Sequence, residues 1–297
     1  MSDLDLSTLW PLVILGGFVV GFLVGMTGVG AGSLMTPFLI TQIGVPPALA
    51  VGTDLLFASI TKASAVWPHH NFGNVNWRLV AWLAMGSVPG SLAMLLLLHA
   101  LDPDIAALNL IIKKALIAAL ILSSIAILIY PLIVRGHGGV SEPADFKVRY
   151  VPTLLLGLTL GSIVTLTSVG AGAIGVVVLT LLYPTLRTRR LIGTDVVHAV
   201  PLTLISGIGH LSIGNASFAL LGLLLVGSIP GIAIGTRLTG ILPDWLLRIF
   251  LAVILCFAAY QLSLKLEDCC LRAVLRRMME SPATPQLGLR WRFVSPG

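Results

Sequence analysis

The chain contains few charged residues. Only 10% of its 297 residues are charged, whereas 57% are hydrophobic, and its mean hydropathy is +1.01. A soluble globular domain carries charge on about a quarter of its residues, so the composition excludes that class and predicts an integral membrane protein. The hydrophobic runs are continuous rather than alternating, and most are about as long as the ~20 residues of one helical crossing. They therefore predict membrane helices and not the strands of a barrel.

Catalytic and metal-binding patterns are also absent from the sequence. Of the three cysteines, Cys256 lies in an apolar run and Cys269 is followed directly by Cys270. This spacing gives neither a disulfide framework nor a metal site. The chain has no Gly-x-Ser-x-Gly, phosphate-loop or Walker motif. We expect no enzyme, no metal and no cofactor, and a membrane assembly factor lacks support for the same reasons.

Two further absences concern targeting and nucleic acid. The N-terminus has no basic leader and begins with Asp3 and Asp5, so we expect the first hydrophobic segment to remain in the mature protein. The net charge of +6 comes from Lys and Arg spread over loops and the tail rather than gathered in one patch. This distribution predicts no nucleic-acid partner; the basic tail is expected to be a membrane-surface or disordered segment.

One block of the chain occurs twice, with a constant separation of 141 residues. Gly52-Thr53-Asp54, His69, Gly73-Asn74 and Gly86-Ser87-Val88-Pro89-Gly90 return as Gly193-Thr194-Asp195, His210, Gly214-Asn215 and Gly227-Ser228-Ile229-Pro230-Gly231. Upstream, Gly28-Val29-Gly30-Ala31-Gly32 returns 140 residues later as Ser168-Val169-Gly170-Ala171-Gly172. Polar groups are costly in apolar segments, and internal repeats with interrupted helices are typical of secondary transporters.

The repeat defines the organisation of the chain. We predict a first membrane repeat over residues 1–134, a polar linker over 135–148, a second membrane repeat over 149–263 and a basic tail over 264–297. Each repeat contains five apolar pieces, and the second piece of each, near 31–43 and 171–183, is too short to cross a ~30 Å core. The prediction is an all-α polytopic membrane protein with short broken or re-entrant helices after glycine-rich loops.

The short pieces also bear on orientation. If the first two pieces of each repeat enter and return on one side, each repeat has three regular crossings and the second is inverted. One face then collects nine basic residues and is cytoplasmic by the positive-inside rule, namely Arg78, Arg135, Lys147, Arg149, Arg187, Arg189, Arg190, Arg237 and Arg248, against Lys113 and Lys114. The basic tail favours a parallel four-plus-four arrangement instead. We favour inversion, and reporter fusions after Arg149 and after Lys265 distinguish the two arrangements.

The glycine-rich loops are the predicted substrate site. Glycine permits unwound backbone, and a following helix N-terminus favours an anion. The residues predicted to bind substrate are Thr27, Gly28, Gly30, Gly32 and Ser33 in the first repeat and Ser168, Gly170 and Gly172 in the second. The alternative is that these small residues only allow close helix packing. A soluble dinucleotide fingerprint is excluded, because no strand and helix with a downstream acid surround them.

A second set of duplicated polar residues is predicted to serve coupling: Thr53, Asp54, His69, Asn74, Thr194, Asp195, His210 and Asn215. An acid in a membrane span can carry a proton or cation, and histidine titrates near neutral pH. The alternative for each Thr-Asp pair is a helix N-cap, and for each histidine an interfacial hydrogen bond.

Lys62 has no counterpart in the second repeat, where Thr203 takes its place. It is predicted to bind an anion directly. Snorkelling of its long side chain to the membrane surface is the alternative. Gly86-x-x-Pro-Gly and its duplicate are expected to mark kinks or close packing surfaces.

Taken together, these elements resemble the TauE/SafE sulfite-exporter family, also called the toluene-sulfonate uptake permease group, over roughly residues 10–263. The marks are Gly28-Val29-Gly30-Ala31-Gly32 with Thr36-Pro37 downstream, Gly52-Thr53-Asp54 and Gly86-Ser87-Val88-Pro89-Gly90. The resemblance implies about eight helices and movement of sulfite, sulfonates or related organosulfur anions, usually as export. The second repeat departs from the first, because Ser168 replaces Gly28 and Thr36-Pro37 has no duplicate.

The sequence and the resemblance lead to one main hypothesis. The chain is expected to be a multi-pass secondary transporter of the cytoplasmic (inner) membrane that exports a small organosulfur anion coupled to protons or another ion. Its partners are then the anion, the coupling ion and the lipid bilayer. The alternative is a passive anion channel with the same broken helices as its constriction.

Overall fold

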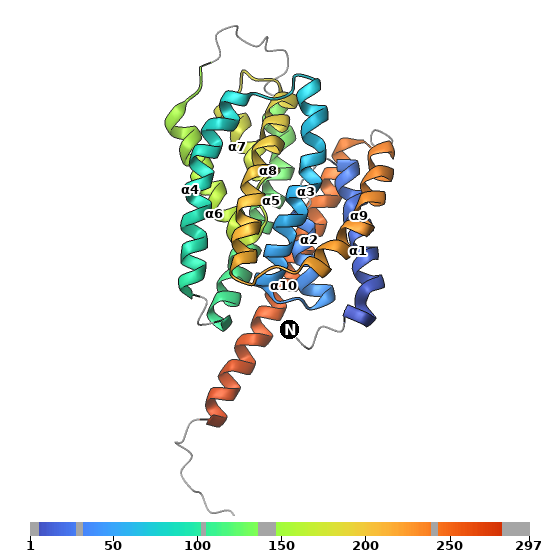
Figure 1. The fold of residues 1–297 in the computed structure, drawn as a ribbon, viewed down its shortest axis with the longest axis vertical. Coiled ribbons are helices and arrows are strands. Elements are labelled where there is room, and N and C mark those ends of the chain that lie inside the picture. The colour runs from blue at the N-terminus through green and yellow to red at the C-terminus, as the bar shows by residue number, and fades with distance from the viewer. Residues whose placement is uncertain (1–5, 28–31, 102–104, 136–146, 239–242, 281–297) are drawn as a thin grey trace, which may run out of the picture.

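The computed structural model describes residues 6–27, 32–101, 105–135, 147–238 and 243–280 (Figure 1). Within these ranges every regular element is a helix, and eight helices are long and apolar enough to cross a membrane. The predicted all-α polytopic class is therefore confirmed. The inverted relation of the two halves stays a prediction.

The helices follow the predicted apolar pieces closely. The first half contains α1 (Leu6–Thr27), α2 (Gly32–Phe38), the short π-helical η1 (Leu39–Ile43), α3 (Pro47–Asn71), α4 (Trp77–Leu101) and α5 (Ile105–Arg135). The second half contains α6 (Tyr150–Thr167), α7 (Ile174–Leu182), α8 (Thr188–Ser212), α9 (Phe218–Leu238) and α10 (Asp244–Glu280). The second piece of each half is a short helix, as expected. α10 continues past residue 263, the predicted end of the second membrane repeat, to Glu280, and the bounds of the repeat stay a prediction.

The two halves pack against each other through matching pairs of helices. α3 packs along α8, α1 along α9, α4 along α6 and α5 along α10. The first helix of each half thus lies on the fourth helix of the other half. In Figure 1 α3 and α8 run in opposite directions, and α10 projects beyond the lower side of the bundle, the side where α1 begins.

Glycines bring the outer helix pairs into close contact. A methyl group at Gly227 of α9 would lie 2.0 Å from the carbonyl oxygen of Ile14 in α1, and one at Gly86 of α4 would lie 2.2 Å from that of Leu154 in α6. Any larger residue would force these backbones apart. The Gly-x-x-Pro-Gly segments are therefore close packing surfaces, one of the two roles expected for them. Membrane helices commonly associate through such small residues.

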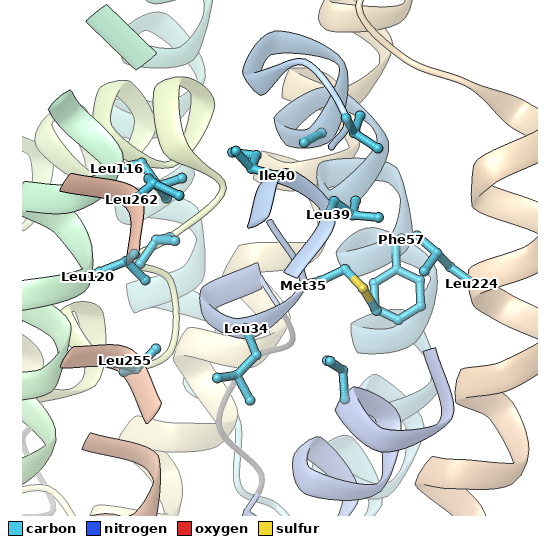
Figure 2. Close-up of a cluster of buried hydrophobic side chains, with 14 of the residues drawn as sticks. Leu34, Met35, Leu39, Ile40, Phe57, Leu116, Leu120, Leu224, Leu255 and Leu262 are labelled. Atoms are coloured by element: carbon cyan, nitrogen blue, oxygen red, sulfur yellow. The ribbon is translucent and has the colours of Figure 1, made fainter. Parts of the chain in front are cut away.

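A large apolar cluster joins helices of both halves. Figure 2 shows Phe57 of α3 with Met35 of α2 and Leu224 of α9 around it, and all three side chains are buried. The cluster continues to α5 and α10 through leucines such as Leu120 and Leu255. Because α2 is held inside this cluster, its polar residues are fixed next to α3.

Candidate functional site

The duplicated Gly-Thr-Asp and His…Gly-Asn segments contact each other across the α3–α8 pair. A methyl group at Gly52 would lie 1.9 Å from the carbonyl oxygen of Asn215, and one at Gly193 would lie 2.1 Å from that of Asn74. These two contacts are equivalents of one another in the two halves. The glycines are therefore needed where the turn after each long helix crosses the opposite helix.

The threonines beside these glycines make a matching pair of hydrogen bonds. The Ser217 amide donates to Thr53 Oγ1 at 3.1 Å, and the Asn76 amide donates to Thr194 Oγ1 at 2.9 Å. Both threonine side chains are fully buried. Each one satisfies a backbone N–H at the turn of the opposite half, which would otherwise be unpaired in an apolar environment.

The duplicated histidines and asparagines lie at these same turns. The Nε2–H of the buried His210 donates to the carbonyl oxygen of Thr165 at 2.9 Å. His69 is half-buried, with Nδ1 2.9 Å from the position a methyl group would take on Gly193. Asn74 and Asn215 donate their backbone amides to the carbonyl oxygens of His69 and His210. The structure therefore places these four residues at the packing turns, against Gly52 and Gly193.

The two duplicated aspartates are buried inside their helices and are not N-caps. α3 begins at Pro47 and α8 at Thr188, so Asp54 and Asp195 both lie well after the first residue of a helix. Both side chains are fully buried. A carboxylate in a membrane span needs a partner or a function.

Lys62 provides the positive charge near both carboxylates. It lies two turns after Asp54 on α3, is only 9% exposed, and interacts electrostatically with Asp54 and Asp195. Its Nζ donates to the carbonyl oxygen of Ala171 at 3.3 Å. The side chain therefore points into the protein and crosses to the glycine-rich loop of the second half, rather than reaching the membrane surface.

The glycine-rich loop of the second half is unwound, as the sequence predicts. Ser168, Gly170 and Gly172 have φ values of 59°, 124° and 115°, in the region that favours glycine. Ser168 is buried close to Asp54, yet its hydroxyl has no hydrogen-bond partner in the described part of the chain. Thr165 and Thr167 direct their hydroxyls to the backbone of α6 instead.

The corresponding loop of the first half is described only in part. Gly28 and Gly30 lie outside the described residues, and so does the side chain of Thr27. Gly32 begins α2, and Ser33 is buried in its first turn. Of the residues predicted to bind substrate, Lys62, Ser168, Gly170 and Gly172 lie together.

Two polar residues of this centre were not among the predicted site residues. Thr36 of α2 donates its hydroxyl to Asp54 Oδ2 at 2.5 Å. His198 of α8 is fully buried, and its Nε2 lies 2.9 Å from Ser87 Oγ of α4. Thr36 enters the sequence analysis only as a mark of the family resemblance, and His198 has no duplicate, because Phe57 stands at its equivalent position. The sequence signal that could have identified His198 is its position about one helical turn after Asp195, on the same face of α8.

A separate hydroxyl cluster joins α4, α6 and α8. Ser206 Oγ lies 2.9 Å from Ser91 Oγ and 2.8 Å from Thr165 Oγ1, and all three side chains are fully buried. The positions equivalent to Ser206, Ser91 and Thr165 hold Ala65, Ile232 and Gly25, which have no hydroxyl. This cluster joins both halves and has no duplicate.

The centre therefore contains one ammonium group, two carboxylates and one imidazole between the two halves. Such a group of residues can hold an anion at the ammonium and exchange protons at the carboxylates. The described residues contain no cluster of His, Cys, Asp and Glu that fits a metal ion.

Fold and site together define a polytopic helical membrane protein with a charged, buried centre between two halves. The family model described as sulfite exporter TauE/SafE matches residues 13–262. The chain belongs to this family and is a membrane transporter.

Curated relatives agree with this assignment. The chain is 37% identical over 230 residues to a Bacillus subtilis protein named "Probable membrane transporter protein YjnA", which covers 76% of this chain and 89% of that protein. It is 25% identical to B. subtilis YdhB (80% and 93% covered) and 26% identical to Methanocaldococcus jannaschii MJ0441 (85% and 95% covered), which carry the same kind of name. No solved structure shows a significant match to the chain.

Proposed function

We propose that the protein is a secondary transporter that exports a small organosulfur anion, such as sulfite or a sulfonate, across the cytoplasmic membrane, coupled to protons. The observation that carries this proposal is the buried Lys62, whose ammonium interacts with both Asp54 and Asp195. Membership of the TauE/SafE family supports the class of anion.

The chemistry of the centre favours an anion as the cargo. The Lys62 ammonium is held at the unwound loop of the second half, next to Ser168, whose hydroxyl is a donor without a partner among the described residues. A small oxyanion accepts hydrogen bonds from both kinds of donor. The site lies between α3 and α8, where repeat-based transporters place their substrates.

The carboxylates favour proton coupling. Asp54 and Asp195 are fully buried, and each has at least one oxygen without a hydrogen-bond partner in the described part of the chain. Removing a charge from such a group by protonation lowers the cost of its burial. Movement of protons with or against the anion then follows from the same residues.

Flux measurements in proteoliposomes test the proposal. With sulfite, thiosulfate and methanesulfonate as probes, we expect saturable flux that is accelerated by a pH gradient. Flux that rises linearly with concentration and follows voltage alone would identify a passive anion channel instead. Absence of flux for all three anions under either gradient polarity would contradict the substrate class.

A further inference from the structure

Asp54 and Asp195 occupy equivalent positions in the two halves but have different hydrogen-bond partners. Thr36 donates its hydroxyl to Asp54 Oδ2, and the Ser168 hydroxyl lies close to the same carboxylate. The backbone amide of Gly172 lies near Asp195, but neither of its carboxylate oxygens has a hydrogen-bond partner among the described residues.

The sequence explains this difference. Thr36, whose hydroxyl bonds to Asp54, corresponds at a separation of 140 residues to Val176, which has no hydroxyl, and Ser168, which lies close to Asp54, corresponds to Gly28. Gly28 lies outside the described residues, but glycine has no side-chain donor. Hydroxyl donors stabilise an ionised carboxylate. Asp54 therefore has such support, and the second half offers Asp195 no equivalent.

Asp195 depends instead on the charge of Lys62. Lys62 interacts electrostatically with both carboxylates, and neither oxygen of Asp195 has a hydrogen-bond partner among the described residues. With both aspartates ionised, one ammonium faces two carboxylates and the centre carries an excess negative charge. An anion that binds the Lys62 ammonium adds another negative charge and weakens the compensation that Lys62 gives to Asp195.

We infer that Asp195, and not Asp54, is the carboxylate that takes up the coupling proton when the anion binds at Lys62. The inference rests on the proposed function and specifies which half performs the coupling. As the anion binds, one proton from the solvent adds to a carboxylate oxygen of Asp195. As the anion leaves, that proton is released and Asp195 pairs again with Lys62. Anion and proton thus move together.

The other titratable groups that face Asp195 are few. α3 contributes Asp54 and Lys62, and α8 itself contributes His198 one turn further on. From α4 the facing side chain is Ser87, and α7 contributes Gly175, whose missing side chain leaves room for Asp195 Oδ1. The described parts of α4, α6 and α7 bring no other charged group to this level of the bundle.

A first test requires no substrate. Lys62→Met removes the counter-charge permanently, so we expect infrared spectra of the purified variant at neutral pH to show a protonated carboxyl band that the wild type lacks. Adding Asp195→Asn should remove this band, whereas adding Asp54→Asn as the matched control should leave it. Absence of the band in Lys62→Met, or its loss with Asp54→Asn alone, would overturn the inference.

A second test keeps Lys62 in place, in case its removal prevents folding. Methanesulfonate and thiosulfate remain ionised near neutral pH, so proton uptake on binding comes from the protein. Calorimetry in two buffers of different ionisation enthalpy should show uptake of about one proton per anion in the wild type and in Asp54→Asn, and none in Asp195→Asn. Uptake that survives in Asp195→Asn would overturn the inference. If the wild type binds neither anion, the proposed function fails. The infrared spectra still test whether Asp195 is the carboxylate that takes up the proton.

Discussion

The residues around Asp54 and those around Asp195 differ although their backbones are arranged alike. Near Asp54 the first half places Met35, Thr36 and Phe57, which are all fully buried. The equivalent positions of the second half hold Gly175, Val176 and His198. One aspartate therefore lies beside an apolar core and accepts a hydroxyl hydrogen bond, while the other lies beside a glycine and an imidazole.

The duplicated Gly-Thr pairs, in contrast, make the same contacts in both halves. Gly52 and Gly193 make the same close contact, and Thr53 and Thr194 make the same hydrogen bond across the α3–α8 pair. The duplicated glycines and threonines therefore hold the two halves together, whereas the residues around the duplicated aspartates differ between the halves. The separation of these two roles can be tested by substitution.

The largest effect is expected at Lys62, which has Thr203 as its counterpart. Lys62→Met removes the cation that the proposed anion site depends on. A charge-assisted hydrogen bond contributes about 1.5–3 kcal/mol, so we expect flux of sulfite into proteoliposomes at subsaturating concentration to fall by about 100-fold. Lys147→Met, in an exposed position before α6, is the control and should retain flux. Normal flux in Lys62→Met would remove the basis of the proposal.

The next effect tests the packing role of the shared residues. Gly52→Ala and Gly193→Ala each place a methyl group about 2 Å from a carbonyl oxygen of the opposite half. Overpacking of this kind costs about 1–3 kcal/mol, and we expect both variants to lower the melting temperature of the purified protein by similar amounts. Gly222→Ala, which meets no atom within 4 Å, should melt like the wild type. A large difference between Gly52→Ala and Gly193→Ala would contradict the equivalence of the two contacts.

The sequence predicts the fold better than it predicts the site, and particular residues show why. Continuous apolar runs and the short second pieces specify α1 to α10, because helix length and hydropathy are local properties. His69 and His210 were grouped with the aspartates because all four are duplicated. They lie at the turns that cross the opposite helices, and because duplication alone cannot separate packing from chemistry, their role in coupling stays a prediction. Thr36 and His198 contact their partners only through tertiary structure, over 18 and 111 residues of sequence.

A smaller effect is expected when Thr36 is made like its counterpart. Thr36→Val removes the hydroxyl that donates to Asp54, and loss of one such hydrogen bond costs about 1–3 kcal/mol. We expect a lower melting temperature and, in the two-buffer calorimetry, additional proton uptake because Asp54 then resembles Asp195. Asp54→Asn in the same Thr36→Val background should abolish the additional uptake. Unchanged proton uptake in Thr36→Val would show that the hydroxyl does not distinguish the two carboxylates.

The smallest effect is expected at His198, the imidazole that the first half replaces with Phe57. Its Nε2 pairs with Ser87 Oγ, and its Nδ1 has no hydrogen-bond partner among the described residues. His198→Phe removes a polar neighbour of Asp195 and leaves Ser87 without this bond, which corresponds to about 1 kcal/mol and a roughly 5-fold loss of proton-driven flux.

Ser87→Ala keeps the imidazole and breaks the same hydrogen bond, so the two variants separate the roles of the bond and the ring. If His198→Phe and Ser87→Ala reduce flux equally, the imidazole acts only through Ser87; a larger loss in His198→Phe indicates that the ring itself supports Asp195. Full flux in His198→Phe would mean that transport does not need the imidazole. The functional difference between the halves would then lie in Lys62 and in the other groups around the two carboxylates.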